Sequence, residues 1–135
     1  MPRTILVVDD DPVIQKLLAV NFEMEGYRVI TAGDGVEGID QVRRERPDLV
    51  LLDVMMPRMD GIAVVRHLKA DPSIAAIPVI LLSAKAQSTD INGGLDAGAD
   101  DYVTKPFDPL ELLDKVTAII GSAEGDDTPS AEAAR

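Results

Sequence analysis

The chain has 135 residues, enough for one domain, and 46% of them are hydrophobic, as a packed core requires. It contains no cysteine, which excludes disulfides, thiolate catalysis and cysteine-ligated zinc. A net charge of -11 argues against direct binding of nucleic acid, whose phosphates are held by clustered Lys and Arg. The apolar runs are far shorter than the ~20 residues that span a bilayer, and the N-terminus lacks the pattern of a signal peptide, so we expect a cytoplasmic protein without membrane insertion.

Five short apolar runs rich in Val, Ile and Leu predict five β-strands. They cover residues 5–8, 29–32, 49–52, 79–82 and, with a weaker pattern, 102–104. The runs are apolar throughout rather than alternating, which is typical of parallel strands covered on both faces by helices. Because segments with helical spacing separate the runs, the sequence predicts an α/β domain with a five-stranded parallel sheet.

The helical segments share two features, an acidic residue at the start and an apolar face. The acidic residues are interpreted as N-caps, because a side-chain oxygen can accept hydrogen bonds from the free backbone N–H groups of the first turn. The expected caps are Asp11, Asp34, Asp60 and Asp108, and the residues expected to face inward are Ile14, Leu17, Leu18 and Phe22, then Val36, Ile39 and Val42, then Ile62, Val65 and Leu68, and finally Leu112, Val116 and Ile119.

The fourth helix, near residues 89–97, has the weakest pattern. Its Gly93-Gly94 pair costs roughly 2 kcal/mol of helix propensity relative to alanine, so we expect a mobile helix there. From Gly121 onward the sequence contains no Val, Leu, Ile, Met or aromatic residue. We therefore expect a folded domain over residues 1–121 and a disordered acidic tail or truncated linker over residues 122–135.

Polar residues follow several predicted strands, at the sheet edge where open α/β sheets bind their ligands. Asp9 and Asp10 follow the first strand, Asp53 the third, Ser83 the fourth and Lys105 the fifth. Adjacent strands lie about 4.8 Å apart, so the three carboxylates can converge, and their repulsion requires a counter-charge. Oxygen ligands without His or Cys indicate a hard cation, and a shallow site suits Mg²⁺ better than Ca²⁺. Lys105 can supply further positive charge or receive an anion bound on the metal.

Simpler structural roles compete with these assignments. A single Asp after a strand is usually a helix cap, but three acids at one sheet edge favour a functional site. Met55, Met56 and Met59 are interpreted as packing and loop residues, because thioethers suit soft metals. His67 is expected to be solvated. Tyr102 is consistent either with a core position or with a functional one.

Four motifs together closely resemble the receiver domain of two-component response regulators, including single-domain chemotaxis receivers. They are VVDDDP, LLDVMMPRMDG, ILLSAKA and GADDYVTKPF, in the order and approximate spacing of that family. The resemblance extends from residue 4 to about residue 120. It implies a flavodoxin-like, doubly wound (βα)5 fold with strand order 2-1-3-4-5.

The resemblance also implies roles for individual residues. Asp53 is the implied phosphoacceptor and a metal ligand, with Mg²⁺ held directly by Asp10 and largely through water by Asp9. The remaining implied roles are the Met55 backbone carbonyl as a metal ligand, Ser83 as the hydroxyl that contacts the phosphoryl group, Lys105 as its positive partner, a cis Lys105–Pro106 peptide bond, and Tyr102 as a switch residue together with Ser83.

The function implied by the resemblance is a phosphorylation-activated signalling switch rather than an enzyme. A sensor histidine kinase or a histidine phosphotransfer protein would donate the phosphoryl group, and the domain would catalyse only its own phosphorylation and slow dephosphorylation. Met55 and Lys85 lie at positions that tune hydrolysis in the family, and Met55 cannot orient water by strong hydrogen bonding. The surface formed by the fourth helix, fifth strand and fifth helix would then control a downstream protein or output domain, or form a phosphorylation-dependent homodimer.

Two other functions compete with the switch. The first is a phospho-independent interaction module of the same fold, but divergent receivers of that kind usually lose an acid or the lysine, and both are present here. The second is a Mg²⁺-dependent phosphatase with an aspartyl intermediate. Such phosphatases typically carry Asp-x-Asp after the first strand, whereas the nucleophile candidate here follows the third.

Overall fold

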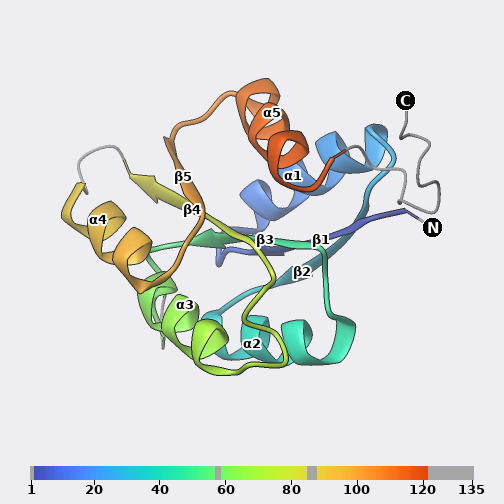
Figure 1. Cartoon of the computed structure of the whole chain (residues 1–135). Coiled ribbons are helices and arrows are strands. Elements are labelled where there is room, and N and C mark those ends of the chain that lie inside the picture. The colour runs from blue at the N-terminus through green and yellow to red at the C-terminus, as the bar shows by residue number, and fades with distance from the viewer. Residues whose placement is uncertain (1, 57–58, 85–87, 122–135) are drawn as a thin grey trace.

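The computed structural model describes residues 2–56, 59–84 and 88–121 (Figure 1). The expected tail, residues 122–135, and Lys85 lie outside the described residues. Strands and helices alternate along the chain. The elements are β1 (Thr4–Val8), α1 (Pro12–Met24), β2 (Arg28–Ala32), α2 (Gly35–Glu45), β3 (Leu49–Asp53), α3 (Gly61–Ala70), β4 (Val79–Ala84), α4 (Ser88–Ala97), β5 (Asp101–Lys105) and α5 (Pro109–Ile120).

The five strands form one parallel sheet in the order β2-β1-β3-β4-β5, as predicted. Helices α1 and α5 cover one face, and α2, α3 and α4 cover the other (Figure 1). Successive residues of a strand point to opposite faces, so Ile5 and Val7 enter the core beneath α1 and α5, while Leu6 and Val8 enter the core beneath α2 and α3. Both faces are covered, which explains why the strands are apolar throughout.

The four predicted N-caps are confirmed. The carboxylates of Asp11, Asp34, Asp60 and Asp108 each accept a hydrogen bond from a backbone N–H group of the first turn. In α2, the Glu37 side chain also accepts a hydrogen bond, at 2.8 Å, from the N–H of Gly33, the residue before the N-cap. In the described part of the chain, no helix is both long and apolar enough to cross a membrane.

Most of the residues expected to face inward are buried, but three are exposed. Leu17 is 40% exposed, Val36 51% and Ile119 37%. Leu17 and Val36 line surface hollows rather than the core, the first beside Phe107 and the second between α2 and α3. Helical spacing gives the direction of each side chain but not how far the sheet extends beneath it. His67 is exposed, as expected.

The two glycines of α4 have a packing role that helix propensity does not reveal. A Cβ atom added to Gly94 would lie 2.1 Å from Cδ1 of Leu81, whereas one added to Gly93 would make an ordinary 3.4 Å contact with Ile62. Gly94 therefore allows α4 to lie directly on β4. The close contact explains at least one of the two glycines without reference to mobility.

Candidate functional site

Three acidic side chains converge at the carboxyl ends of β1 and β3. The two strands pair in register, with Val8 opposite Leu52, so the residues that follow, Asp9 and Asp53, come from adjacent positions. Asp9 is fully buried and Asp53 is 4% exposed, while Asp10 lies at the surface. One carboxylate oxygen from each of the three lies within 4.8 Å of the others, which confirms the predicted cluster.

Lys105 brings a positive charge to the two buried acids. Its Nζ atom lies 3.0 Å from Oδ2 of Asp9 and 3.3 Å from Oδ1 of Asp53. The lysine ends β5 and its side chain is 26% exposed, so one amine contacts two carboxylates that come from two other strands. The Lys105–Pro106 peptide bond that follows is cis, as the resemblance implied.

The backbone around Asp9 is fixed by a residue that the sequence analysis missed. The Gln15 side-chain amide donates to the carbonyl oxygens of Asp9, at 2.6 Å, and of Ala32, at 3.1 Å. Asp9 N also donates to the Ala32 carbonyl, and Asp11 N donates to Oδ1 of Asp9 at 2.9 Å. The sequence feature that could have indicated this role is the position of Gln15, a long side chain with an uncharged amide, one turn into the helix that follows the acidic residues of the first strand end.

A glycine sets the close approach of α3 to β3. A Cβ atom on Gly61 would lie 2.5 Å from the Asp53 carbonyl oxygen and 2.8 Å from Cα of Val54. Gly61 N donates to the Val54 carbonyl at 2.9 Å, and Val54 N donates to the Leu82 carbonyl at 3.0 Å. The chain thus leaves β3 along a path that only glycine fits at this point, which holds Asp53 at the sheet edge.

Burial dominates the electrostatics of the site. Burial, followed by the charge of Asp9, raises the pKa of Asp53 from 3.8 to about 6, although Lys105 and the N–H of Met55 act in the opposite direction. Burial tends to lower the pKa of Lys105, but its hydrogen bond to Asp9 and the neighbouring negative charges outweigh that effect and raise it. Above a pH of about 6, Asp53 is therefore mostly ionised and faces the positively charged Lys105.

The donor set fits a hard divalent cation. Among the described residues, the three acids and Lys105 carry a formal net charge of about -2, and all the converging acidic atoms are oxygens. Mg²⁺ prefers such ligands and usually keeps several waters, which an exposed Asp10 permits. Met55 N donates to Oδ1 of Asp53 at 3.3 Å. The Met55 carbonyl as a metal ligand stays a prediction.

The two predicted switch residues lie on neighbouring strands. Ser83 is fully buried on β4, opposite Thr104 of β5, and its neighbour Leu82 pairs with Asp53. Tyr102 is 37% exposed on β5, so its interpretation as a core residue is wrong. The roles of Ser83 and Tyr102 in switching stay predictions.

Known proteins match both the sequence and the fold. Residues 5–117 match the family described as the response regulator receiver domain. The chain is 48% identical over 120 residues to the DNA-binding dual master transcriptional regulator RpaA of Synechocystis sp., covering 89% of this chain and 49% of that protein. It spans about half the length of such relatives.

Two solved structures show the same fold. The chemotaxis protein CheY4 of Vibrio cholerae has a TM-score of 0.83 and 28% identity, with 88% of this chain and 99% of that chain covered. The receiver domain of the sensor histidine kinase PA1611 of Pseudomonas aeruginosa, with a magnesium ion in its active-site cleft, has a TM-score of 0.82 and 34% identity, with 90% of this chain and 100% of that chain covered.

Proposed function

The chain belongs to the family of response regulator receiver domains, and we propose that it acts as a switch that accepts a phosphoryl group on Asp53. One observation carries the proposal. The Asp53 carboxylate is almost fully buried at a strand end, within 3.3 Å of Lys105 and within 4.8 Å of two further carboxylates. A purely structural Asp would not need two acids beside it.

The side chains present support an aspartyl phosphate. A carboxylate oxygen can attack the phosphorus of a phosphohistidine and displace the imidazole nitrogen. A pKa of about 6 leaves most of Asp53 ionised at neutral pH and therefore nucleophilic. Lys105 neutralises charge on the attacking and transferred oxygens, and the Ser83 hydroxyl can donate to a phosphoryl oxygen. Phosphoryl transfer needs mainly such alignment and charge neutralisation.

Asp9, Asp10 and Asp53 are the residues that would hold a magnesium ion. When bound, Mg²⁺ supplies positive charge to the oxygens of the transferred group. The chain's own contribution is to keep Asp9 in place through Gln15 and Lys105, so that the carboxylates are already positioned. This preorganisation lowers the cost of assembling the site for each transfer.

Strand β5 connects the site with the proposed output surface. Lys105 ends the strand and Tyr102 lies three residues earlier. A phosphoryl group on Asp53 adds oxygens that compete for Lys105 and Ser83, which biases the two-state equilibrium of β5 and its neighbours α4 and α5. We propose that a cytoplasmic sensor kinase or phosphotransfer protein is the donor. RpaA is named as DNA-binding, but we do not assign DNA contacts to this acidic domain.

Intact mass measurement after incubation with acetyl phosphate tests the proposal. With Mg²⁺ we expect a gain of one phosphoryl group, which EDTA and Asp53→Asn abolish and Asp114→Asn, at an exposed position of α5, leaves unchanged. Absence of any gain would instead support an inert interaction module. Continuous release of phosphate from phosphomonoesters would support a phosphatase.

A further inference from the structure

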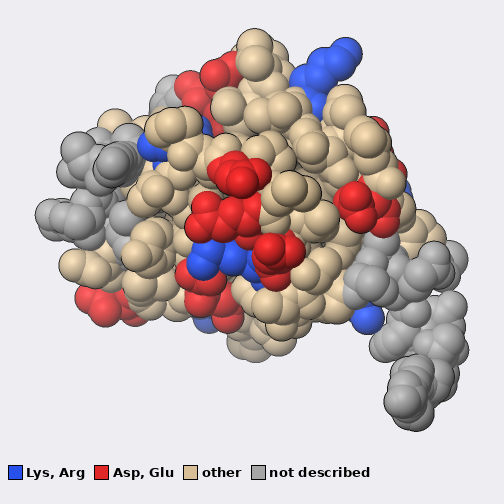
Figure 2. Space-filling view, turned by 90° about the horizontal axis from the view of Figure 1, so that it is seen from above, with Lys and Arg blue, Asp and Glu red and all other residues tan. Residues whose placement is uncertain are grey.

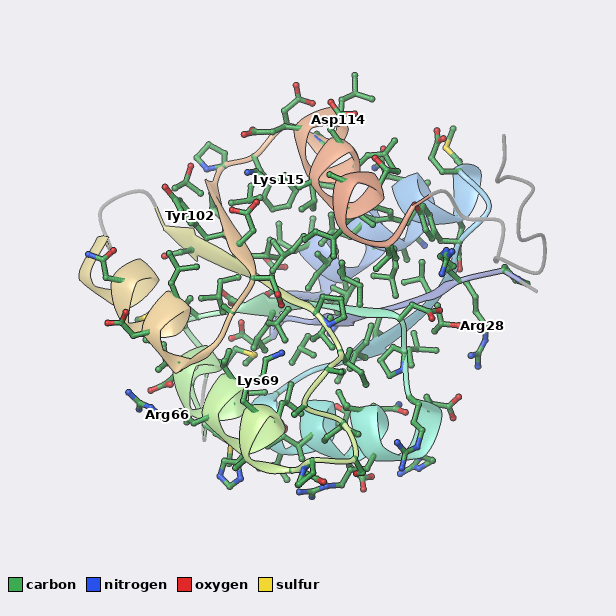
Figure 3. All side chains as sticks on the ribbon, in the orientation of Figure 1. Arg28, Arg66, Lys69, Tyr102, Asp114 and Lys115 are labelled. Atoms are coloured by element: carbon green, nitrogen blue, oxygen red, sulfur yellow. The ribbon has the colours of Figure 1, made fainter. Side chains whose placement is uncertain are left out.

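The α4-β5-α5 face combines exposed apolar side chains with acidic ones. Strand β5 is an edge of the sheet, and the Tyr102 side chain on it is 37% exposed. Figure 3 shows Tyr102 between α4 and α5, with Lys115 and Asp114 on α5. Leu95 of α4 is 36% exposed. The α4-β5-α5 face is defined here by Leu95, Asp101, Tyr102, Glu111, Asp114 and Lys115.

The packing of α4 gives the direction of Leu95. Gly93 lies against Ile62 of α3 and Gly94 against Leu81 of β4. Successive residues of a helix are separated by about 100°, so Leu95 points away from α3. Strand β5 lies on the side of α4 that faces away from α3 (Figure 1). Leu95 and Tyr102 therefore form an apolar centre on this surface.

Contacts of α5 place its acids beside that centre. Lys115 Nζ lies 3.1 Å from Oδ2 of Asp101, which fixes the side of α5 that faces β5. Glu111 precedes Lys115 by four residues and so lies on the same side. Leu113 is on the opposite side, next to Phe22 of α1. Asp114 is exposed farther outward.

The negative charge of this face is not balanced. Asp101 and Lys115 neutralise each other, but Glu111 and Asp114 are exposed and have no ion pair within the parts of the chain that the structure describes. Figure 2, which looks down on α5, shows acidic side chains gathered around a small basic area. In a symmetric dimer, Glu111 and Asp114 of each copy would need basic partners from the same face of the second copy, and Lys115, the one basic side chain of the face as defined, is already paired with Asp101. Nucleic acid and anionic membranes would be repelled by the same acids.

We infer that the α4-β5-α5 face binds a protein segment that carries Lys or Arg around an apolar anchor, in preference to a second copy of the chain. The apolar anchor would cover Leu95 and Tyr102, and the basic side chains would pair with Glu111 and Asp114. Complementary charge raises the rate of association and rejects wrong partners. The inference rests on the proposed function, because it identifies the partner class of the proposed output surface.

An amphipathic peptide of Lys and Leu is a suitable probe, with a counterpart in which Glu replaces every Lys. We expect the Lys peptide to bind and to shift the NMR signals of residues 95–118, while the Glu peptide does not bind. The double variant E111Q/D114N should weaken binding about tenfold, since each exposed ion pair contributes up to about 1 kcal/mol. Added salt should weaken binding as well, through screening.

The double variant E23Q/D40N removes the same number of charges from α1 and α2 and serves as the matched control. It should change the affinity less than about twofold. Equal losses in the two double variants, or shifts spread over the whole surface, would overturn the inference, because binding would then follow net charge alone.

Sedimentation of the acetyl phosphate-treated protein tests the preference over a second copy. We expect a monomer, and a dimer that shifts the signals of this face would overturn the inference. Intact mass of the same sample separates the two proposals. Failure to phosphorylate Asp53 contradicts the proposed function, whereas the peptide titration of the untreated protein still tests the charge of the face.

Discussion

Replacing Asp53 by asparagine should stabilise the metal-free protein, although it removes the proposed phosphoacceptor. Burial and the charge of Asp9 raise the pKa of Asp53 from 3.8 to about 6. The folded protein therefore holds this proton more tightly than the unfolded chain does, and ionisation of the group opposes folding. The favourable contribution that protonated Asp53 makes to stability is fully present below about pH 4 and is lost as the pH rises through about 6.

The size of this effect follows from the pKa difference. About 2 pKa units correspond to about 3 kcal/mol, and the variant gains somewhat less because Lys105 loses one of its two partners. We expect Asp53→Asn to raise the free energy of unfolding by about 1 to 3 kcal/mol at pH 8 in EDTA. The gain should shrink as the pH falls from about 6 to about 4.

Urea denaturation in EDTA across this pH range measures the difference directly. Asp114→Asn, at an exposed position of α5, is the control for the substitution itself and should change the free energy of unfolding by less than about 0.5 kcal/mol. Mg²⁺ at a hundred times its Kd should stabilise the natural sequence by about 2.7 kcal/mol and so reduce the advantage of the variant. A variant that is no more stable at pH 8, or whose gain does not depend on pH, would refute the reasoning.

Three further predictions concern packing and lifetime. Gly94→Ala should destabilise the fold by about 1 to 3 kcal/mol, because the added Cβ would meet Leu81, whereas Gly93→Ala should stabilise it by up to about 1 kcal/mol. Thermal unfolding measures both variants, and a shift of the two melting temperatures in the same direction would contradict this prediction. Tyr27→Phe should cost about 1 kcal/mol in urea denaturation, because the buried hydroxyl donates to the Gly121 carbonyl at 2.8 Å, and an unchanged midpoint would argue against that bond. Met55→Asn should shorten the lifetime of the aspartyl phosphate, since Met55 is 57% exposed and its thioether cannot orient water; a decay within seconds that the substitution leaves unaltered would contradict this.

The features that the sequence predicted well are encoded locally. Leu49 to Leu52 are all fully buried because each side chain enters one of two cores, and a strand buried on both faces leaves an uninterrupted apolar run. An N-cap such as Asp60 needs only its own side chain and an N–H three residues later. The convergence of Asp9 and Asp53 followed from the topology, since carboxyl ends of parallel strands meet at one edge.

The features that the sequence did not predict depend on contacts between distant segments. Gln15 acts on the carbonyl of Ala32, and nothing in its local pattern indicates that partner. Gly94 lowers helix propensity, yet its contact with Leu81 becomes visible only when α4 lies on β4. The pairing of Lys105 with Asp9 joins residues 96 positions apart; the sequence placed Lys105 at the same sheet edge as the acids but did not indicate that Asp9 is its partner.

The cost of burying Asp53 and the proposed switch have the same physical origin. A carboxylate beside Asp9, compensated only in part by Lys105, keeps the metal-free site under repulsion, which a bound cation would relieve. Lys105 is shared between two carboxylates, so a change at Asp53 alters its contacts without breaking all of them. Because Lys105 lies on the strand that carries Tyr102, β5 is the route by which, in the proposed switch, the alteration would reach the sheet edge where Tyr102 is exposed.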